Sequence, residues 1–399
     1  MASSRTFGIV VDGSGAISVL EKLDTGFRKL DSSSAKAGKS IDKSGKSSKV
    51  AARAKKDLNN EVGGLVTRYA SLGAAVAAAT ALVVGSIGGF NSFQQSIAEI
   101  DTLLGKTQNI EAYSDSVRKL SGEFGTNNVE QAAALYSVIS AGASDAAEAT
   151  VILTAANKLA IGGVTDVATA ADGLTSVLNA YSLGADQAGM VSDILFATMK
   201  GGKTTIGELA SSLGKVAPLA SSLGVGLDEL NAAIAVTTKG GVKTAEAITQ
   251  IKAALSNVLT PSLKATELSA KLAKENENLG FQFSAAGLKA DGLAGFLKKV
   301  EIATGGSEEK MALLFGSTDA VQVIMQLAGA KADDFASSLD SIRNSAGETD
   351  RAFGKFTETI GFKYDTTIQQ VRNLAVSFGE SLGPAILSAL KGVNLLISN

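Results

Sequence analysis

The fold is decided by residues 192–261, which read SDILFATMKGGKTTIGELASSLGKVAPLASSLGVGLDELNAAIAVTTKGGVKTAEAITQIKAALSNVLTP. Four short helical patterns follow one another here, and each ends at Gly or Pro. Apolar residues spaced three or four positions apart mark one face of a helix. Such spacing predicts short helices that pack on one another, with three faces formed by Ile206, Leu209, Ala210, Leu213, Val216 and Ala217, by Leu227, Leu230, Ala233, Ile234 and Thr237, and by Ile248, Ile251, Leu255, Val258 and Leu259.

The ends of these helices are also marked. Thr205 is followed three residues later by Glu208. This is the spacing of a capping box, in which the hydroxyl and the carboxylate each bind a free amide at the helix start. We expect the second helix to stop at Gly240-Gly241 and the third to stop before Pro261.

Upstream, residues 91–200 repeat this organisation of a capping residue, a helical pattern and a closing Gly. Asn127 with Glu130 is a second candidate capping box, and it would open a helix over 132–141. Asp145 with Glu148 is a third, and it would open a helix that runs to Gly162-Gly163. Two further helices are predicted, over 165–181 and 186–200.

Downstream of Pro261 the composition changes. Residues 262–278 predict a charged helix, and Phe281–Phe283 predicts one short strand. Residues 350–399 predict one or two long helices, interrupted at Gly379–Pro384. Nine of the 15 Phe lie beyond residue 280, so this part can bury more area per residue.

The first 60 residues are basic. They hold 12 Lys or Arg against six Asp or Glu, whereas the whole chain has a net charge of −2. Thr6–Asp12 predicts a short strand and Ala16–Leu30 a helix, and Asp31–Asp57 is low in complexity. This last segment is either a solvated linker or a basic arm on an acidic surface. It has no interleaved aromatic residues, which argues against sequence-specific nucleic-acid binding. The candidate contact residues of the arm are Lys36, Lys39, Lys43, Lys46, Lys49, Arg53, Lys55 and Lys56.

Residues 69–90 read YASLGAAVAAATALVVGSIGGF and carry no charge. As a helix, Tyr69–Phe90 would span about 33 Å, which is close to the thickness of a bilayer core. Gly85 and Gly89 have the small-xxx-small spacing that lets two helices approach closely. Two interpretations stay open, a helix buried between copies of the chain and a helix inserted in a membrane.

The composition excludes several kinds of chemistry. The chain has no His and no Cys, so disulfides, thiolate nucleophiles, zinc-finger ligation and His-based acid–base catalysis are absent. Gly202-Lys203-Thr204 resembles the end of a phosphate-binding loop, but the required Gly five residues before Gly202 is Ala197. A Gly-Gly helix stop followed by a capping Thr explains it better. We therefore predict no catalytic residue, no metal ligand and no cofactor.

Acidic residues have a structural explanation. Three pairs of carboxylates lie near predicted helix starts, where negative charge is favoured by the helix dipole. Asp193 lies between apolar Val191 and Ile194, and we interpret it as a surface residue or a capping partner. The three pairs are Asp228-Glu229, Glu308-Glu309 and Asp333-Asp334.

A series of motifs resembles the core region of phage tail tape measure proteins. Each motif is short, and their order over residues 90–390 carries the resemblance. The two longest are ASSLGKVAPLASSLGVGLDEL at 210–230 and KGGVKTAEAITQIKAAL at 239–255. The others are SAGASDAAEA at Ser140–Ala149, LTP at Leu259–Pro261, LGFQF at Leu279–Phe283, LLFGSTDA at Leu313–Ala320 and SLGPA at Ser381–Ala385.

This resemblance implies a structural protein rather than an enzyme. Such a protein is made in the host cytoplasm, occupies the lumen of the tail tube, sets tail length during assembly and leaves before or with the DNA. The implied partners are the tail tube protein, tail-tip or baseplate proteins, an assembly chaperone and further copies of the chain. Coiled-coil segments and contact with a host membrane are further expectations.

Together these observations predict a mainly all-α chain, an array of short packed helices with a long Ala/Gly-rich apolar helix and a small N-terminal strand. Four segments are expected: the strand, helix and basic arm over 1–60, the apolar helix over 61–91, a helical core over 92–261, and a helical region over 262–399 that continues in a longer chain. The alternative is a pore-forming toxin or membrane-active effector, because Tyr69–Phe90 stands beside amphipathic helices. Dye leakage from liposomes, compared with incorporation into tail-like particles, discriminates between the two.

Overall fold

A computed structural model describes residues 89–105, 108–374, 376–377 and 380. The predicted strand over Thr6–Asp12 lies outside the described residues. The contacts divide the chain into two units, of which one is residues 93–373 and the other joins residues 1–92 to 374–399. The unit 93–373 holds nearly all of the described residues, and its fold is the one given below. The division into four segments stays a prediction.

The all-α class is confirmed, since the described residues form helices joined by turns and loops, and no strand occurs among them. Residues 89–101 and 360–374 are helical at the two ends of this part of the chain. The first half of the unit contains α3 (Ile110–Phe124), α4 (Asn128–Ser140), α5 (Ala146–Gly162), α6 (Val167–Ala180), the 3₁₀ turn η1 (Ala185–Gln187), α7 (Ala188–Gly201), α8 (Ile206–Leu213), α9 (Ala217–Ser222) and α10 (Leu227–Lys239). The second half contains α11 (Thr244–Leu259), α12 (Leu263–Glu275), the 3₁₀ turn η2 (Glu277–Leu279), α13 (Ala285–Thr304), α14 (Glu308–Phe315), α15 (Thr318–Ile324), the π-helical η3 (Met325–Ala330), α16 (Ala332–Arg343) and α17 (Glu348–Thr357).

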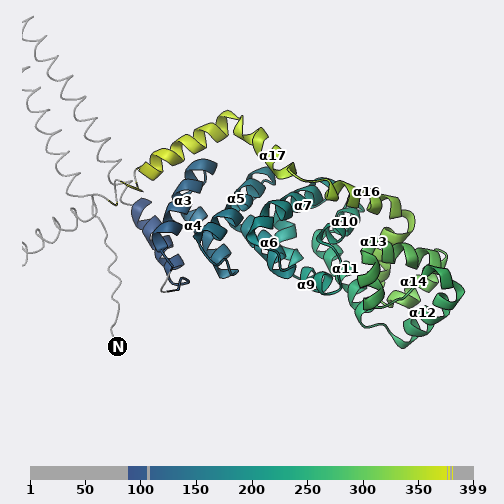
Figure 1. Ribbon diagram of the computed structural model, residues 1–399. Helices are drawn as coiled ribbons and strands as arrows, with labels where there is room; N and C mark the ends of the chain where they lie inside the picture. The colour runs from purple at the N-terminus through teal and green to yellow at the C-terminus, as the bar shows by residue number, and fades with distance from the viewer. Residues whose placement is uncertain (1–88, 106–107, 375, 378–379, 381–399) are drawn as a thin grey trace, which may run out of the picture. The chain divides into compact units, whose positions relative to one another are not determined.

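Within the unit the helices follow one another in a row and the chain then returns along it (Figure 1). The row runs from α3 and α4 through α6, α8 and α11 to α12 and α14. On the way back, α16 packs on α10, and α17 packs on α7 and α5. The helical residues 360–373 then reach α3, where the Asn373 side-chain amide donates to the Arg118 carbonyl oxygen at 2.8 Å. The Arg118 guanidinium also lies 5.9 Å from the centre of the Phe93 ring. Arg118 therefore contacts both ends of the unit, Phe93 through its side chain and Asn373 through its backbone carbonyl.

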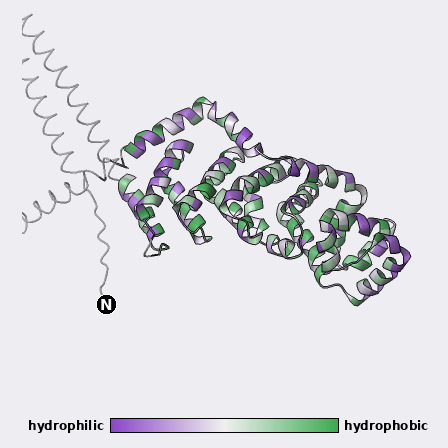
Figure 2. Cartoon of the chain, in the orientation of Figure 1, coloured by the Kyte–Doolittle hydropathy of each residue, from purple (hydrophilic) through white to green (hydrophobic). Residues whose placement is uncertain are grey.

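The core of the unit is made by apolar faces of short amphipathic helices (Figure 2). Small residues let these helices approach closely. A Cβ added to Gly173 on α6 would lie 2.9 Å from the Cβ of Ala210 on α8, so a larger residue at 173 would force the two helices apart. Between such contacts the larger buried side chains fill the space, among them Phe93, Tyr113, Leu120, Leu135, Leu153, Leu159, Leu174, Leu195, Phe281, Phe296 and Phe315.

The predicted helix starts agree with the structure in most places. Thr205 and Glu208 form the predicted capping box, with Glu208 N donating to Thr205 Oγ1 and Thr205 N donating to Glu208 Oε2, both at 3.2 Å. Asn127 caps α4 by accepting from Val129 N, so this helix begins earlier than the predicted start at residue 132. Asp145 caps α5. The Glu148 carboxylate, however, accepts from Ser144 and not from Asp145 as a capping box requires.

The helix predicted from Ile206 to Ala217 is wrong in its length. α8 ends at Leu213 and a turn through Gly214 follows, so that Val216 and Ala217 reach the core from the turn and from the start of α9. The three- to four-residue spacing continues across the turn because both segments bury an apolar side toward the same core. A prediction from periodicity alone therefore treats two short helices as one.

The strand predicted at Phe281–Phe283 is also wrong. These residues form a loop between η2 and α13, and no strand occurs among the described residues. Phe281 and Phe283 are both buried, and the Phe283 ring meets the Phe315 ring edge-on, with 4.9 Å between their centres. Apolar and polar residues alternate here because Phe281 and Phe283 are buried and hold the loop against the core.

The last predicted helix is interrupted earlier than expected. α17 ends at Thr357, a turn covers Glu358 and Thr359, and residues 360–374 form the next helical stretch. The predicted interruption at Gly379–Pro384 lies outside the described residues, apart from Glu380. The early break lets the returning chain change direction between its contacts with α5 and its contacts with α3.

Candidate functional site

The residues predicted to make contacts lie mostly outside the described part of the chain. This holds for all eight Lys and Arg of the basic arm and for Tyr69 and Gly85. Gly89 and Phe90 are described and begin the helical residues 89–101. Among the described helices, none is both long enough and apolar enough to cross a membrane.

The segment that resembles a phosphate-binding loop is a helix junction, as the sequence suggested. α7 ends at Gly201 with Gly202 as its C-cap, and Thr205 caps α8. Between them, the Lys203 backbone amide donates to Thr238 Oγ1 at 3.2 Å. The loop is therefore held by α10 and follows a helix, whereas a phosphate-binding loop follows a strand.

The three carboxylate pairs lie in the first turns of their helices, as expected. Asp228-Glu229 open α10, Glu308-Glu309 open α14 and Asp333-Asp334 open α16. In these positions negative charge interacts favourably with the helix dipole. In the described part of the chain, no group of three acidic side chains is arranged to hold a metal ion.

Asp193 caps a helix that begins 155 residues later, at Glu348. Its carboxylate accepts from Gly347 N at 2.7 Å and from Thr349 N at 2.9 Å, at the N-terminus of α17. Of the two roles left open for this residue, the structure shows the capping role. The adjacent Ser192 hydroxyl lies 3.2 Å from Thr349 Oγ1 in a buried position.

Two ion pairs strengthen the same attachment. Lys200 lies 3.1 Å from Glu348 and Lys158 lies 2.8 Å from Asp350. Hydrogen bonds from Arg351 and Lys200 lower the pKa of the Glu348 carboxyl group. We call this set of contacts the α17 clamp, and it comprises Lys158, Ser192, Asp193 and Lys200 on one side and residues 347–350 on the other.

Glu229 joins the start of α10 to the middle of α13. Its carboxylate accepts from Gly226 N at 3.1 Å, and from Leu293 N and Ala294 N at 3.0 Å each. α13 is kinked at Gly292, whose φ of 68° lies in the left-handed region that Gly adopts readily. The kink leaves the amides of the next turn without helical partners, and Glu229 supplies the missing acceptor. We call this contact the α13 joint.

The α13 joint was not predicted from the sequence, where Glu229 is explained by the dipole of its own helix alone. The sequence shows only that Glu229 stands next to Leu230 of an apolar helix face, whereas the structure shows that Glu229 is 93% buried. An acid in such a place needs a partner that donates hydrogen bonds.

A cavity of about 540 Å³ lies beside Asp193 of the α17 clamp and the first residues of α10. Its lining is mostly apolar, and Asp228 and Arg343 form an ion pair there at 2.7 Å. Hydrogen bonding to Asp228 raises the pKa of Arg343. Burial, together with the charges of Asp228 and Glu229, raises the pKa of the Tyr181 hydroxyl, so this group stays protonated at neutral pH. The lining residues are Tyr181, Leu183, Met190, Asp193, Ile194, Leu227, Asp228, Ile342, Arg343, Ser345 and Ala346.

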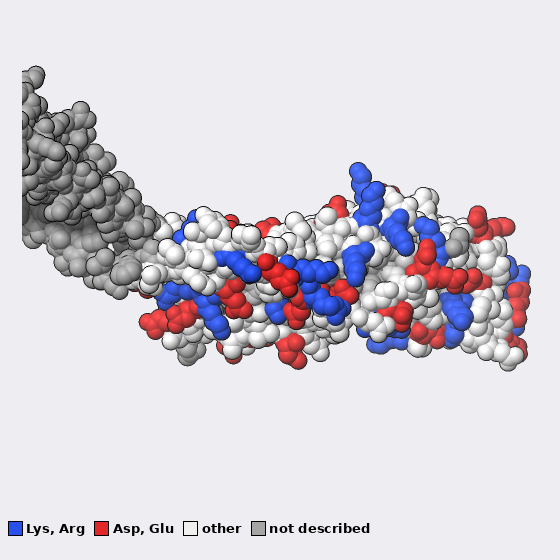
Figure 3. Space-filling model, turned by 90° about the horizontal axis from the view of Figure 1, so that it is seen from above, with Lys and Arg blue, Asp and Glu red and all other residues white. Residues whose placement is uncertain are grey.

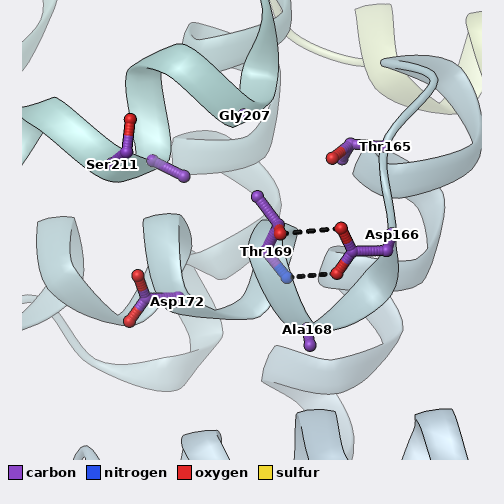
Figure 4. A pocket seen from close by; sticks show the side chains of 8 residues that line it. Thr165, Asp166, Ala168, Thr169, Asp172, Gly207 and Ser211 are labelled. Carbon is purple, nitrogen blue, oxygen red and sulfur yellow. Dashed lines mark hydrogen bonds between the residues drawn. The ribbon is translucent and has the colours of Figure 1, made fainter.

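A second, more open depression lies between α6 and α8 (Figure 4). Asp166 caps α6 there by accepting from Thr169 N at 2.8 Å and from Thr169 Oγ1 at 2.7 Å. The bond from the Thr169 backbone amide lowers the pKa of Asp166. The Asp166 carboxylate is thus occupied in capping, and Thr169, Asp172 and Ser211 offer no nucleophile paired with a base.

The surface charges show no concentration of one sign on the face seen in Figure 3. Lys and Arg side chains lie among Asp and Glu side chains along the described part of the chain. A face of mixed charge has no field of one sign to attract a strongly charged partner. The geometry of the unit is therefore that of a packed helical scaffold, held by caps and ion pairs.

Comparisons with known proteins agree with this description. The family model of phage-related minor tail proteins matches residues 114–316, from α3 to the residue after α14. The chain is 25% identical over 337 residues to a probable tape measure protein of Clostridium phage phiCD119, which covers 79% of this chain and 35% of that protein. It is 26% identical over 241 residues to the tape measure protein of Pneumococcus phage Dp-1, which covers 58% of this chain and 20% of that protein.

No solved structure matches the chain. The alignments span about a third and a fifth of the lengths of the two relatives. Because the family match extends over half of the residues and both relatives are named as tape measure proteins, the chain belongs to the family of phage-related minor tail proteins.

Proposed function

We propose that this chain acts within a tape measure protein, which lies in the lumen of a phage tail tube and sets the length of the tail during assembly. The observation that carries the proposal is the family match over residues 114–316, together with the names of the two relatives. The proposed partners are the tail tube protein, tail-tip or baseplate proteins and an assembly chaperone. Release of the protein would then clear the tube for the DNA.

The high helical content is suited to this role. The packing of the folded unit means that part of it must rearrange before the chain can lie extended along the tube. A fully helical chain of 399 residues would span on the order of 600 Å, because an α-helix rises about 1.5 Å per residue. In the structure α12 instead packs on α13 and α14, with Ala265 and Leu272 completely buried. For tail length to depend on this segment, α12 must leave these neighbours and lie along the tube axis.

Tail length is the test. Deleting residues 262–278 in frame should shorten tails by about 25 Å, and duplicating them should lengthen tails equally, if each residue adds a helical rise along the axis. Electron microscopy of the particles measures both. As a control, Leu272→Ala loosens α12 without changing the number of residues, so it should leave tail length unchanged.

The opposite result has a clear meaning. If both length variants assemble normally and give tails of unchanged length, residues 262–278 belong to a folded plug or tip module. The length-setting role would then be wrong for this segment.

We also propose that the basic arm contacts an acidic partner inside the tail. The excess of Lys and Arg within residues 1–60 supports it. Replacing Lys36, Lys39, Lys43 and Lys46 with Glu should reduce the yield of assembled tails, and high salt should reduce it in the unmodified protein because exposed charges are screened. Unchanged assembly by the fourfold variant would show that the segment is only a linker.

Residues 69–90 are proposed to pack against copies of themselves through Gly85 and Gly89. The small side chains at these positions support this proposal.

A further inference from the structure

The cavity between α7, α10 and α16 has the composition of a ligand site. These three helices pack on one another, and the cavity of about 540 Å³ lies beside the loop that leads from α16 to α17. Its volume falls within the range of about 300–1,000 Å³ that is typical of ligand sites, which are mostly apolar and hold a few polar groups. The lining here is mostly apolar too, and Met190, which forms part of it, is 46% exposed.

One polar group of the lining lacks a hydrogen-bond partner. The Tyr181 hydroxyl is buried, and it has no partner among the described residues. Buried polar side chains are nearly always hydrogen-bonded, because an unpaired one costs free energy. Burial and the charges of Asp228 and Glu229 raise the pKa of this hydroxyl, so it keeps its proton at neutral pH and can donate it. The group that would complete the cavity is therefore a hydrogen-bond acceptor.

The charges around the cavity determine which acceptor it can take. Asp193 and Asp228 line it together with one cation, Arg343, which gives the lining a net charge of −1. The negative charges of Glu229 and Asp340 also reach Arg343. This excess of negative charge repels a carboxylate or a phosphate and attracts a cation, whereas a neutral carbonyl group is tolerated. The acceptor that fits Tyr181 is therefore uncharged.

We propose that the cavity binds a peptide segment of a partner protein, in which a large apolar side chain such as Leu stands beside a Lys or Arg. The apolar side chain fills the cavity, and a backbone carbonyl oxygen of the segment accepts from Tyr181. The basic side chain lies near Asp193 and Asp228. A peptide suits the site because it carries a neutral acceptor next to an apolar group. The inference does not depend on a role in setting tail length.

A bound segment would act on the α17 clamp as well. Asp193 both lines the cavity and caps α17, and Ser345 and Ala346 line the cavity from the loop before α17. The segment would thus contact α7, α10 and the loop before α17 together, an arrangement that exists only in the folded unit. A ligand that binds the folded state alone stabilises it by mass action. Filling the cavity therefore opposes detachment of the returning helices.

Methyl NMR of the full chain tests the site directly. The chain has five Met, of which Met190 lines the cavity and Met311 is buried in α14 outside the lining. The probe is the blocked peptide acetyl-Gly-Leu-Lys-Gly-amide, titrated into protein labelled at its Met methyl groups. We expect the Met190 signal to shift until it saturates and the Met311 signal to stay in place.

Two matched probes test the chemistry of the ligand. Replacing Leu of the probe with Ala removes most of its apolar area and should weaken binding about tenfold. Replacing Lys of the probe with Glu reverses its charge and should also weaken binding, more strongly at low salt than at high salt because exposed charges are screened.

Three variants test the residues of the cavity. Tyr181→Phe removes only the hydroxyl, so it should weaken binding of the probe about three- to tenfold without lowering the midpoint of thermal unfolding. Ala346 is exposed, and Ala346→Trp places a large ring beside the cavity and should abolish the Met190 shift. Ala112→Trp makes the same change at an exposed position of α3 and should leave the shift as it is.

Several results would overturn the proposal. It is wrong if none of the probes moves the Met190 signal, if the Ala probe or the Glu probe binds as tightly as the original, or if Ala346→Trp binds like the unmodified chain. Equal binding by Tyr181→Phe would show that the hydroxyl does not contact the segment.

Discussion

Replacing Glu229 with alanine should lower the free energy of unfolding of the unit 93–373 by about 3–5 kcal/mol. The change removes the acceptor for the amides of Gly226, Leu293 and Ala294, and the Leu293 amide is buried. A buried amide left without a partner costs about 1–3 kcal/mol, and losses above roughly 3 kcal/mol are typical of a broken buried network. Chemical denaturation followed by circular dichroism measures the effect.

Two further variants show whether the α13 joint is responsible. Glu308→Ala removes an acid from the first turn of α14, where it is exposed, so only about 0.3–1 kcal/mol should be lost through the helix dipole. Glu229→Gln keeps one side-chain oxygen as an acceptor and should fall between the two. Equal losses from Glu229→Ala and Glu308→Ala would mean that packing alone holds the kinked part of α13.

Replacing Asp193 with alanine should detach the start of α17 and cost about 2–4 kcal/mol. The carboxylate caps this helix through two short bonds to Gly347 N and Thr349 N. Loss of a cap costs about 0.5–2 kcal/mol, and a hydrogen bond to a charged group contributes about 1.5–3 kcal/mol. Hydrogen exchange at the Gly347 and Thr349 amides should accelerate, and limited proteolysis should cut first at the Glu358–Thr359 turn.

The neighbouring ion pair provides the control for this variant. Asp350→Ala breaks the contact with Lys158, but the Asp350 side chain is 65% exposed. Exposed ion pairs contribute about 0–1 kcal/mol, so exchange at Gly347 and Thr349 should stay close to that of the unmodified protein. If Asp193→Ala behaves like Asp350→Ala, the start of α17 is held by packing on α5 and α7 and not by the Asp193 carboxylate.

Local features of this chain could be predicted because they depend on residues close in sequence. The capping box of Thr205 and Glu208 and the stop before Pro261 follow from spacings of a few residues, and both are present. The overextended first helix shows the limit of this approach. Gly214 ends α8, yet the apolar spacing continues through Val216, and only packing in three dimensions separates the two segments.

Contacts between distant residues could not be predicted in the same way. The sequence suggests that Asp193 caps something, but a carboxylate does not indicate which amides it will bind 154 residues away. The contacts of Glu229 are harder to predict, because the amides that it binds are free only where α13 is kinked at Gly292. The phenylalanines at 281 and 283 gave a strand pattern because alternation reports burial on one side and cannot distinguish a sheet from an anchored loop.

The meeting of Phe93 and Asn373 at Arg118 has a mechanical consequence. Because both ends of the unit contact the same residue, tension on the flanking chain would act at two neighbouring points. We expect a force applied in this geometry to separate the returning helices from the row one contact after another, beginning at Arg118 and reaching the α17 clamp later. The row of helices would then not be sheared along its length, and only a few bonds would resist the force at any moment. We therefore expect the unit 93–373 to unfold gradually when its two ends are pulled apart.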